Sequence, residues 1–267
     1  MTGKDKVIVI LNTITLVLML FFNYAFSTGL FYGVTVGEVS YKYDTLFTPS
    51  GYAFAIWSVI FLLCIGFVGY HWFLLKRGDP EFYIKRTGIW FIIGNLANAL
   101  WLYCWTNEMI GWSVILILIL LCSLCVLTVR LRLELDDVPV RTIFFVWWPI
   151  VFYLAWIMVA TIACIAAWFV SNGWRGGAIA EDIWAITMIA AAGVLYLLLV
   201  RKRNLREAAA VGIWAFVAIA VRQWHTHNNI AITAIAAGAI LLVVIVHHAY
   251  KRRHYLPHAK IKRGEWK

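Results

Sequence analysis

The sequence contains little charge. Asp, Glu, Lys and Arg make up 13% of its 267 residues, and hydrophobic residues make up 63%. A soluble domain of this length would carry charge at about 25% of its positions. The composition therefore excludes an ordinary soluble domain and indicates a polytopic membrane protein with almost no domain outside the bilayer.

Charged side chains are also missing from the middle of the long apolar runs. Those nearest to the runs lie at expected helix ends or in short turns: Glu108, Glu181, Asp182, Arg222 and His225. Proton pumps, voltage sensors and ion-coupled carriers need charge at membrane depth, so the pattern argues against all three. It also argues against a membrane hydrolase, because no acid, base and nucleophile converge. A binding protein is favoured over an enzyme.

Clear metal and redox motifs are absent too. The sequence His225-Thr-His227-Asn228 has no nearby carboxylate or further ligand, which makes a metal site the less favoured interpretation. Cys122 and Cys125 lie in an apolar run without an adjacent His or charge, which is typical of inert thiols. No metal or other cofactor is expected to be required.

Long apolar runs dominate what is present. Each is long enough to cross a hydrocarbon core of about 30 Å as a helix. The sequence predicts an all-α fold with eight transmembrane helices, at 7–29, 52–75, 87–106, 111–129, 142–170, 181–200, 207–224 and 229–250.

Basic residues are distributed unevenly between the two ends of these spans. Threading the eight spans through a membrane places 20 of the 23 Lys and Arg residues on one side. The opposite side receives Lys42, Arg175 and Arg222. Because cytoplasmic loops are enriched in Lys and Arg, both termini are expected in the cytoplasm, with the protein in the inner membrane.

The net charge of +10 has the same explanation. Basic cytoplasmic loops account for it, so a nucleic-acid partner is not expected, and the lipid bilayer is the expected surrounding. The basic tail, 251–267, is expected to lie on the anionic inner leaflet.

Aromatic content divides the chain into two groups of helices. Ten of the 15 Trp residues precede residue 171, whereas the last three spans are rich in Ala and Gly. Small side chains allow close helix packing in lipid. We therefore expect a five-helix bundle at 1–170 and three further helices at 171–250, with the boundary in the loop 171–180.

Three spans each carry a stripe of aromatic, amide and small side chains on one helical face. The stripes are Phe54, Trp57, Phe61 and Cys64; Gly94, Asn98, Trp101 and Trp105, with Asn95 beside them; and Tyr153, Trp156, Ala160 and Cys164. Such a stripe often serves helix packing, and an intramembrane Asn often bonds a neighbouring helix. The alternative is a pocket in which a flat apolar ligand stacks on the rings beside amide donors.

The loop 30–50 is the longest on its side and precedes the second span. It carries Tyr41 and Tyr43 and ends in a turn at Pro49 and Gly51. It is either a lid over the bundle or an interfacial loop with the usual aromatic belt.

Three motifs resemble a known family. They are YLAWIMVATIACIAAW from Tyr153 to Trp168, NALW from Asn98 to Trp101, and TPSGYAFAIW ending at Trp57. In order and position they are similar to those of the tryptophan-rich sensory protein family, which includes TspO and the mitochondrial translocator protein. The resemblance covers 1–170, and the extra spans are similar to those of a longer bacterial branch. One of the family's paired prolines is missing beside Pro49, and Cys164 stands where the family usually has Asn.

The resemblance implies a ligand and a site. Family members bind porphyrins, haem-like tetrapyrroles, sterols and synthetic aromatic compounds between the five helices, under the loop that follows the first helix. Carried onto this chain, the site consists of Pro49, Phe54, Trp57, Asn95, Asn98, Trp101, Tyr153 and Trp156, to which the stripe on the third span adds Trp105.

Three functions remain open at this point. The first is a receptor or transporter for a porphyrin, haem-like tetrapyrrole, sterol or isoprenoid. The second is an enzyme that degrades a porphyrin in light and oxygen, an activity proposed for the family. The third is a structural or transport subunit of a larger membrane complex, and a homodimer is a further alternative.

Overall fold

The computed structural model describes residues 3–31, 33–77, 83–253 and 256–266. Residues 1–2, 32, 78–82, 254–255 and 267 lie outside this description, including parts of the predicted loop 30–50 and of the tail 251–267. Every regular element in the described residues is helical. The predicted all-α bundle is confirmed to that extent.

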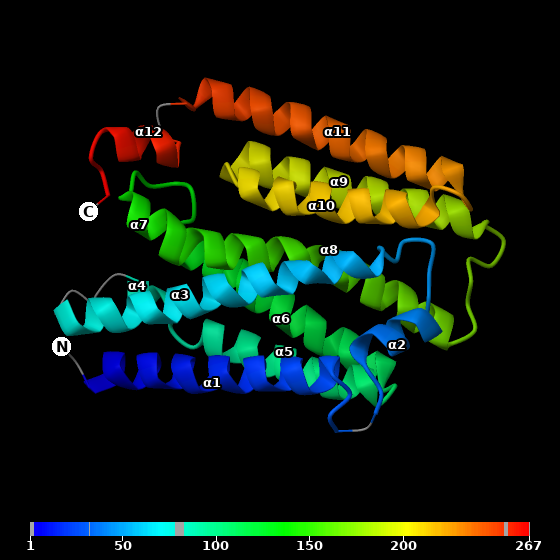
Figure 1. Cartoon of the computed structure of the whole chain (residues 1–267), viewed down its shortest axis with the longest axis horizontal. Coiled ribbons are helices and arrows are strands. Elements are labelled where there is room, and N and C mark those ends of the chain that lie inside the picture. The colour runs from blue at the N-terminus through cyan, green and yellow to red at the C-terminus, as the bar shows by residue number, and fades with distance from the viewer. Residues whose placement is uncertain (1–2, 32, 78–82, 254–255, 267) are drawn as a thin grey trace.

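Eight long helices run along the length of the molecule, with the two ends of the chain at the same end of the bundle (Figure 1). They are α1 (Gly3–Ser27), α3 (Ile56–Arg77), α5 (Trp90–Thr106), α6 (Ile110–Arg130), α8 (Trp148–Ser171), α9 (Glu181–Arg203), α10 (Arg206–Gln223) and α11 (Asn228–Lys251). Short helical segments connect or follow them: α2 (Val36–Lys42), η1 (Gly51–Ala55), α4 (Tyr83–Thr87), α7 (Val140–Thr142), η2 (Ile143–Trp147) and α12 (Pro257–Lys262).

Six segments of the described chain are long and apolar enough to cross a membrane: those built on α1, α3, α6, α8, α9 and α11. The chain is therefore a multi-pass membrane protein. The expected count of eight is not confirmed for the other two helices. α5 has 17 residues, and α10 has 18 residues that include Arg206, Glu207 and Arg222.

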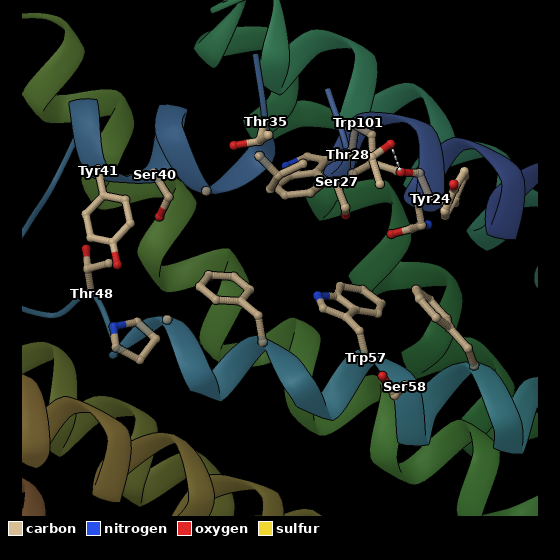
Figure 2. A pocket seen from close by; sticks show the side chains of 18 of the residues that line it. Tyr24, Ser27, Thr28, Thr35, Ser40, Tyr41, Thr48, Trp57, Ser58 and Trp101 are labelled. Carbon is tan, nitrogen blue, oxygen red and sulfur yellow. Dashed lines mark hydrogen bonds between the residues drawn. The ribbon is translucent and has the colours of Figure 1, made fainter. Parts of the chain in front are cut away.

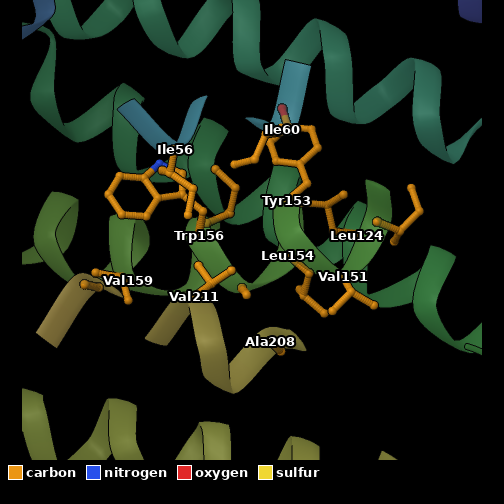
Figure 3. Close-up of a cluster of buried hydrophobic side chains, with 14 of the residues drawn as sticks. Ile56, Ile60, Leu124, Val151, Tyr153, Leu154, Trp156, Val159, Ala208 and Val211 are labelled. Atoms are coloured by element: carbon orange, nitrogen blue, oxygen red, sulfur yellow. The ribbon is translucent and has the colours of Figure 1, made fainter. Parts of the chain in front are cut away.

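Helix α8 lies between the two helix groups and packs against helices of both, among them α3, α6 and α10. Figure 3 shows Tyr153 and Trp156 directed toward Ile56 and Ile60 of α3. On the opposite face, Val151 and Leu154 are directed toward Ala208 and Val211 of α10. Helix α8 thus contacts both helix groups, and it belongs to the most buried of the six candidate membrane spans.

Close packing of small residues attaches the last three helices to the first five. A methyl group at Gly212 of α10 would lie 2.6 Å from two ring carbons of Tyr196 on α9. The space left by the glycine lets the Tyr196 hydroxyl donate a hydrogen bond to the Ala155 carbonyl of α8 at 2.7 Å. Small side chains permit such close approach in lipid, where packing drives helix association.

Candidate ligand-binding cavity

A cavity of about 580 Å³ lies between α1, α3 and α5 beneath α2 (Figure 2). Its walls include Asn23 and Ser27 of α1, Thr28 directly after α1, Ser40 and Tyr41 of α2, Pro49, Phe54 of η1, Trp57 and Phe61 of α3, Trp101 of α5 and Arg222 of α10. The volume falls within the range of about 300–1,000 Å³ that is usual for small-molecule sites.

Indole rings from two helices form the apolar part of the wall. Trp57 extends from α3 and Trp101 from α5 into the same space (Figure 2). Each ring is supported by a second one: Trp57 stacks on Phe61 with centroids 5.3 Å apart, and Trp101 on Trp105 at 5.5 Å. These flat surfaces are suited to stacking against a planar ligand.

A smaller cavity of about 50 Å³ adjoins the first on the side of α8. Pro49, Phe54 and Trp101 line both cavities, whereas Trp105 and Trp156 line the smaller one. The Trp156 indole N–H is buried and has no hydrogen-bond partner among the described residues. The Trp101 indole N–H has only the Cys164 thiol beside it, which is a weak acceptor. Both indoles can therefore donate to a polar ligand atom.

Three of the expected site residues do not line either cavity. Asn98 accepts a hydrogen bond from the Asn23 amide at 2.8 Å, and Asn95 donates to the Thr15 hydroxyl at 3.3 Å. Tyr153 is buried beneath Trp57, and its hydroxyl lies 3.6 Å from the Met19 sulfur. These polar groups join α5 and α8 to α1, which is the helix-packing interpretation of the stripes.

The segment above the cavity is an ordered helix rather than an irregular loop. At its start, Thr35 and Glu38 form a reciprocal capping box, in which the Glu38 amide donates to the Thr35 hydroxyl at 3.2 Å and the Thr35 amide to the Glu38 carboxylate at 2.7 Å. This arrangement satisfies backbone donors that a seven-residue helix would otherwise expose. Helix α2 thus presents Ser40 and Tyr41 to the cavity as a defined cover.

The two ends of α2 are attached to α5 and to the turn that follows α5. Trp105 donates its indole N–H to the Val36 carbonyl at 3.1 Å. Glu108 accepts hydrogen bonds from the Lys42 ammonium and, at 2.7 Å, from the Tyr43 hydroxyl. The Lys42 ammonium, followed by the Tyr43 hydroxyl, lowers the pKa of the Glu108 carboxyl, and the same carboxylate raises the pKa of Lys42.

The segment between α2 and α3 is attached to α10, which belongs to the appended helices. Arg222 donates to the Asp44 carboxylate at 2.6 Å and lies over the Tyr41 ring at 5.3 Å from its centroid. Gln223 donates to the Leu46 carbonyl at 3.0 Å, and Trp214 to the Ala53 carbonyl at 3.0 Å. Helix α10 therefore fixes the chain that leads from the cover into α3.

Two sets of lining residues were not expected from the sequence. Those on α1, Asn23 and Ser27, recur four residues apart, a spacing that indicates a polar face on the first span. Arg222 was assigned to a helix end, and its approach to the cavity depends on a contact across more than 170 residues. No local signal predicts such a contact.

The cavity combines apolar walls with hydroxyl, indole and guanidinium donors, an arrangement suited to binding. Among the described residues, no group of three His, Cys, Asp or Glu side chains could hold a metal ion. A family model described as TSPO-like protein matches residues 9–247, from α1 into α11. No curated protein and no solved structure matches the chain.

Proposed function

The chain belongs to the TSPO-like protein family, and from this membership together with the cavity we propose a membrane receptor for a flat hydrophobic ligand. The ligand class is a porphyrin or haem-like tetrapyrrole, as the family resemblance implies. The observation that carries the proposal is the space of about 580 Å³ between Trp57 and Trp101, covered by α2.

Polar groups around the cavity suit the edge of such a ligand. Tetrapyrroles combine a planar apolar ring with carboxylate side chains. Arg222 places a guanidinium on the cavity wall, and Ser27 and Ser40 add hydroxyl donors. Guanidinium groups pair well with carboxylates, so these residues would orient a ligand that the indoles hold by stacking.

The position of the cover supports a sensory role. Helix α2 contacts the turn after α5 through Glu108, and the residues that follow it contact α10 through Arg222. A ligand that alters the position of α2 would change both sets of contacts, which lie on different helix groups. Ligand binding would thereby be transmitted to the appended helices as a shift between two arrangements.

The same proposal includes the orientation in the membrane. All eight long helices, including α5 and α10, would cross the bilayer, because they lie alongside one another in the bundle (Figure 1). The two ends of the chain lie at the same end of the bundle, as an even number of crossings requires. Both termini would face the cytoplasm from the inner membrane, with α2 on the opposite side.

The proposal is tested by titrating the purified chain with protoporphyrin and following the visible absorbance of the ligand. We expect saturable binding in which Trp57→Leu and Trp101→Leu each weaken the affinity about 5- to 30-fold, since each removes roughly 1–2 kcal/mol of stacking and apolar contact. Trp112→Leu is the matched control because Trp112 is an exposed indole on α6 that does not line this cavity.

Comparing the affinities of the variants shows whether protoporphyrin binds in this cavity. If all three variants bind protoporphyrin like the parent, the ligand does not occupy this cavity. If the parent shows no saturable binding of protoporphyrin, the tetrapyrrole class itself is wrong.

A further inference from the structure

A second polar cavity, of about 290 Å³, lies at the end of the bundle opposite α2. We call it the Arg206 cavity. It is lined by the loop between α6 and α7, by Trp147 of η2, Arg206 of α10, His248 and Arg252 of the α11 end, and Lys260 of α12. It shares no lining residue with the candidate ligand site.

Arg206 is the most unusual group in this cavity, because its charged side chain is only 9% exposed. The nearest carboxylate oxygens, on Glu134 and Glu207, lie 3.9 Å from its Nη2 atom, which is too far for a hydrogen bond. Its Nε and Nη1 atoms are buried and have no hydrogen-bond partner among the described residues. Buried guanidinium groups normally have their donors satisfied, so a partner is expected here.

Two further side chains on the wall each have a buried nitrogen atom without a hydrogen-bond partner among the described residues. The Trp147 indole N–H is buried without a partner among the described residues. So is Nδ1 of His248, whose other ring nitrogen lies 3.1 Å from the Asn204 side-chain oxygen. Asn204 donates its amide N–H to the Glu134 carbonyl, so its oxygen accepts from His248 Nε2 and leaves Nδ1 as an acceptor. Residues from three helical elements, each with a buried nitrogen that has no partner among the described residues, thus meet at one cavity.

Two of the three acidic residues on the wall, Asp136 and Asp137, are paired with other cations. Arg132 binds the Asp136 carboxylate with two nitrogens at 2.9 Å, and Lys260 pairs with Asp137. Burial, followed by repulsion from Glu207, raises the pKa of Glu134 to about 8, so that this carboxyl is largely protonated at neutral pH. Asp136 and Asp137 are therefore paired with other cations, and the two carboxyl groups that face Arg206, those of Glu134 and Glu207, do not come within hydrogen-bond distance of it.

We propose that the Arg206 cavity binds a phosphate group, carried either by a free phosphate compound or by the headgroup of an anionic lipid. Arg206 and Trp147 donate to the phosphate oxygens, and His248 Nδ1 accepts from a protonated phosphate oxygen. Phosphate matches the planar fork of donors on a guanidinium, and the volume accommodates a group of this size.

Helix α12 forms one wall of the cavity, and a bound phosphate group would stabilise its docked position. It is attached by Lys260, which also donates to the Val138 carbonyl at 2.7 Å, and by the Val140 amide, which donates to the Glu265 carbonyl at 3.0 Å. A phosphate that joins Arg206 to this wall stabilises the docked helix, so occupancy should raise the thermal stability of the full chain.

The test measures the melting temperature of the detergent-solubilised full chain against two probes. One arm compares inorganic phosphate with chloride at equal ionic strength. The other compares micelles containing phosphatidic acid with micelles containing phosphatidylcholine. Phosphate groups should stabilise the parent, and Trp147→Phe and Arg206→Lys should each weaken the apparent affinity about tenfold, the effect of losing one hydrogen bond to a charged group.

Matched variants distinguish phosphate binding in the Arg206 cavity from general attraction of phosphate to the positively charged chain. Trp147→Phe keeps an aromatic ring and removes only the donor, so it remains informative if Arg206→Lys fails to fold. Lys262→Gln removes a cation from α12 that does not line the cavity and should bind phosphate like the parent. Stabilisation in both arms indicates a site open to free phosphate, and stabilisation by phosphatidic acid alone indicates a lipid headgroup. No stabilisation in either arm, or equal affinity in the parent and Trp147→Phe, overturns the proposal.

Discussion

Gly212→Ala should detach the appended helices from α8 although it adds a single methyl group. The new carbon would lie 2.6 Å from Cδ2 and Cε2 of Tyr196 and 3.0 Å from Cγ, so the ring must move. Overpacking of this kind costs about 1–3 kcal/mol. Displacing Tyr196 also breaks its buried hydrogen bond to Ala155, which costs about 1–3 kcal/mol. The expected total is about 2–6 kcal/mol.

The assay is thermal unfolding of the purified chain in detergent. A loss of about 2 kcal/mol should lower the melting temperature by about 4–8 °C for a protein of this size. Gly193→Ala is the matched control, because a methyl group at this buried position on α9 would meet nothing within 4 Å. It should melt at or above the parent temperature, since alanine is the better helix former.

The melting temperatures of the two alanine variants test whether α9 and α10 approach as closely as the structure shows. Equal melting temperatures for Gly212→Ala and the parent would refute the close approach of α9 and α10. A ligand measurement extends the test, because α10 also carries Arg222. If α10 positions the cover of the cavity, Gly212→Ala should bind protoporphyrin more weakly than Gly193→Ala does.

Three further changes test the cover and the opposite end of the bundle. Arg222→Gln should weaken protoporphyrin binding about 3- to 10-fold, as removal of a partly exposed charged hydrogen bond would. Arg175→Gln changes an arginine that does not line this cavity and should have no effect. Thr35→Ala removes the capping box and should cost about 1 kcal/mol, seen as faster amide hydrogen exchange at 36–42; unchanged exchange would contradict the cap. Glu134 binds its proton more tightly in the folded chain, with a pKa of about 8 against 4.5, so the unfolding free energy should fall as pH rises between these values. Glu134→Gln should flatten that dependence in melting curves measured across the range, and an unchanged slope would show that another group causes it.

Helix positions follow closely from the sequence because charged residues limit the apolar runs. The expected spans 111–129, 181–200 and 229–250 correspond to Ile110–Arg130, Glu181–Arg203 and Asn228–Lys251. Helix α2 was missed, although the Thr35-x-x-Glu38 pattern of a capping box is readable in the sequence. Its short length hid it, because a seven-residue helix gives little periodic signal.

The stripes on the helices identified faces but not what those faces contact. Trp57 and Trp101 lie on the cavity wall. Asn98 lies on the same stripe as Trp101, but it does not line the cavity, and its side-chain oxygen accepts a hydrogen bond from Asn23. Helical spacing places residues on one side of a helix, but that side can contact two neighbours along its length. Only the arrangement of α1 against α5 separates the two roles.

The sequence by itself determined the all-α membrane class, the positions of the long helices and the family, because these depend on composition, the length of apolar runs and local motifs. The cavity volume, its cover and the contribution of α10 were decided by tertiary structure. They arise from groups far apart in sequence, such as Arg222 and Asp44, that meet only after the helices pack. The same holds for the Arg206 cavity, because burial of a cation is a property of the assembled helices and not of the residues that surround it in the chain.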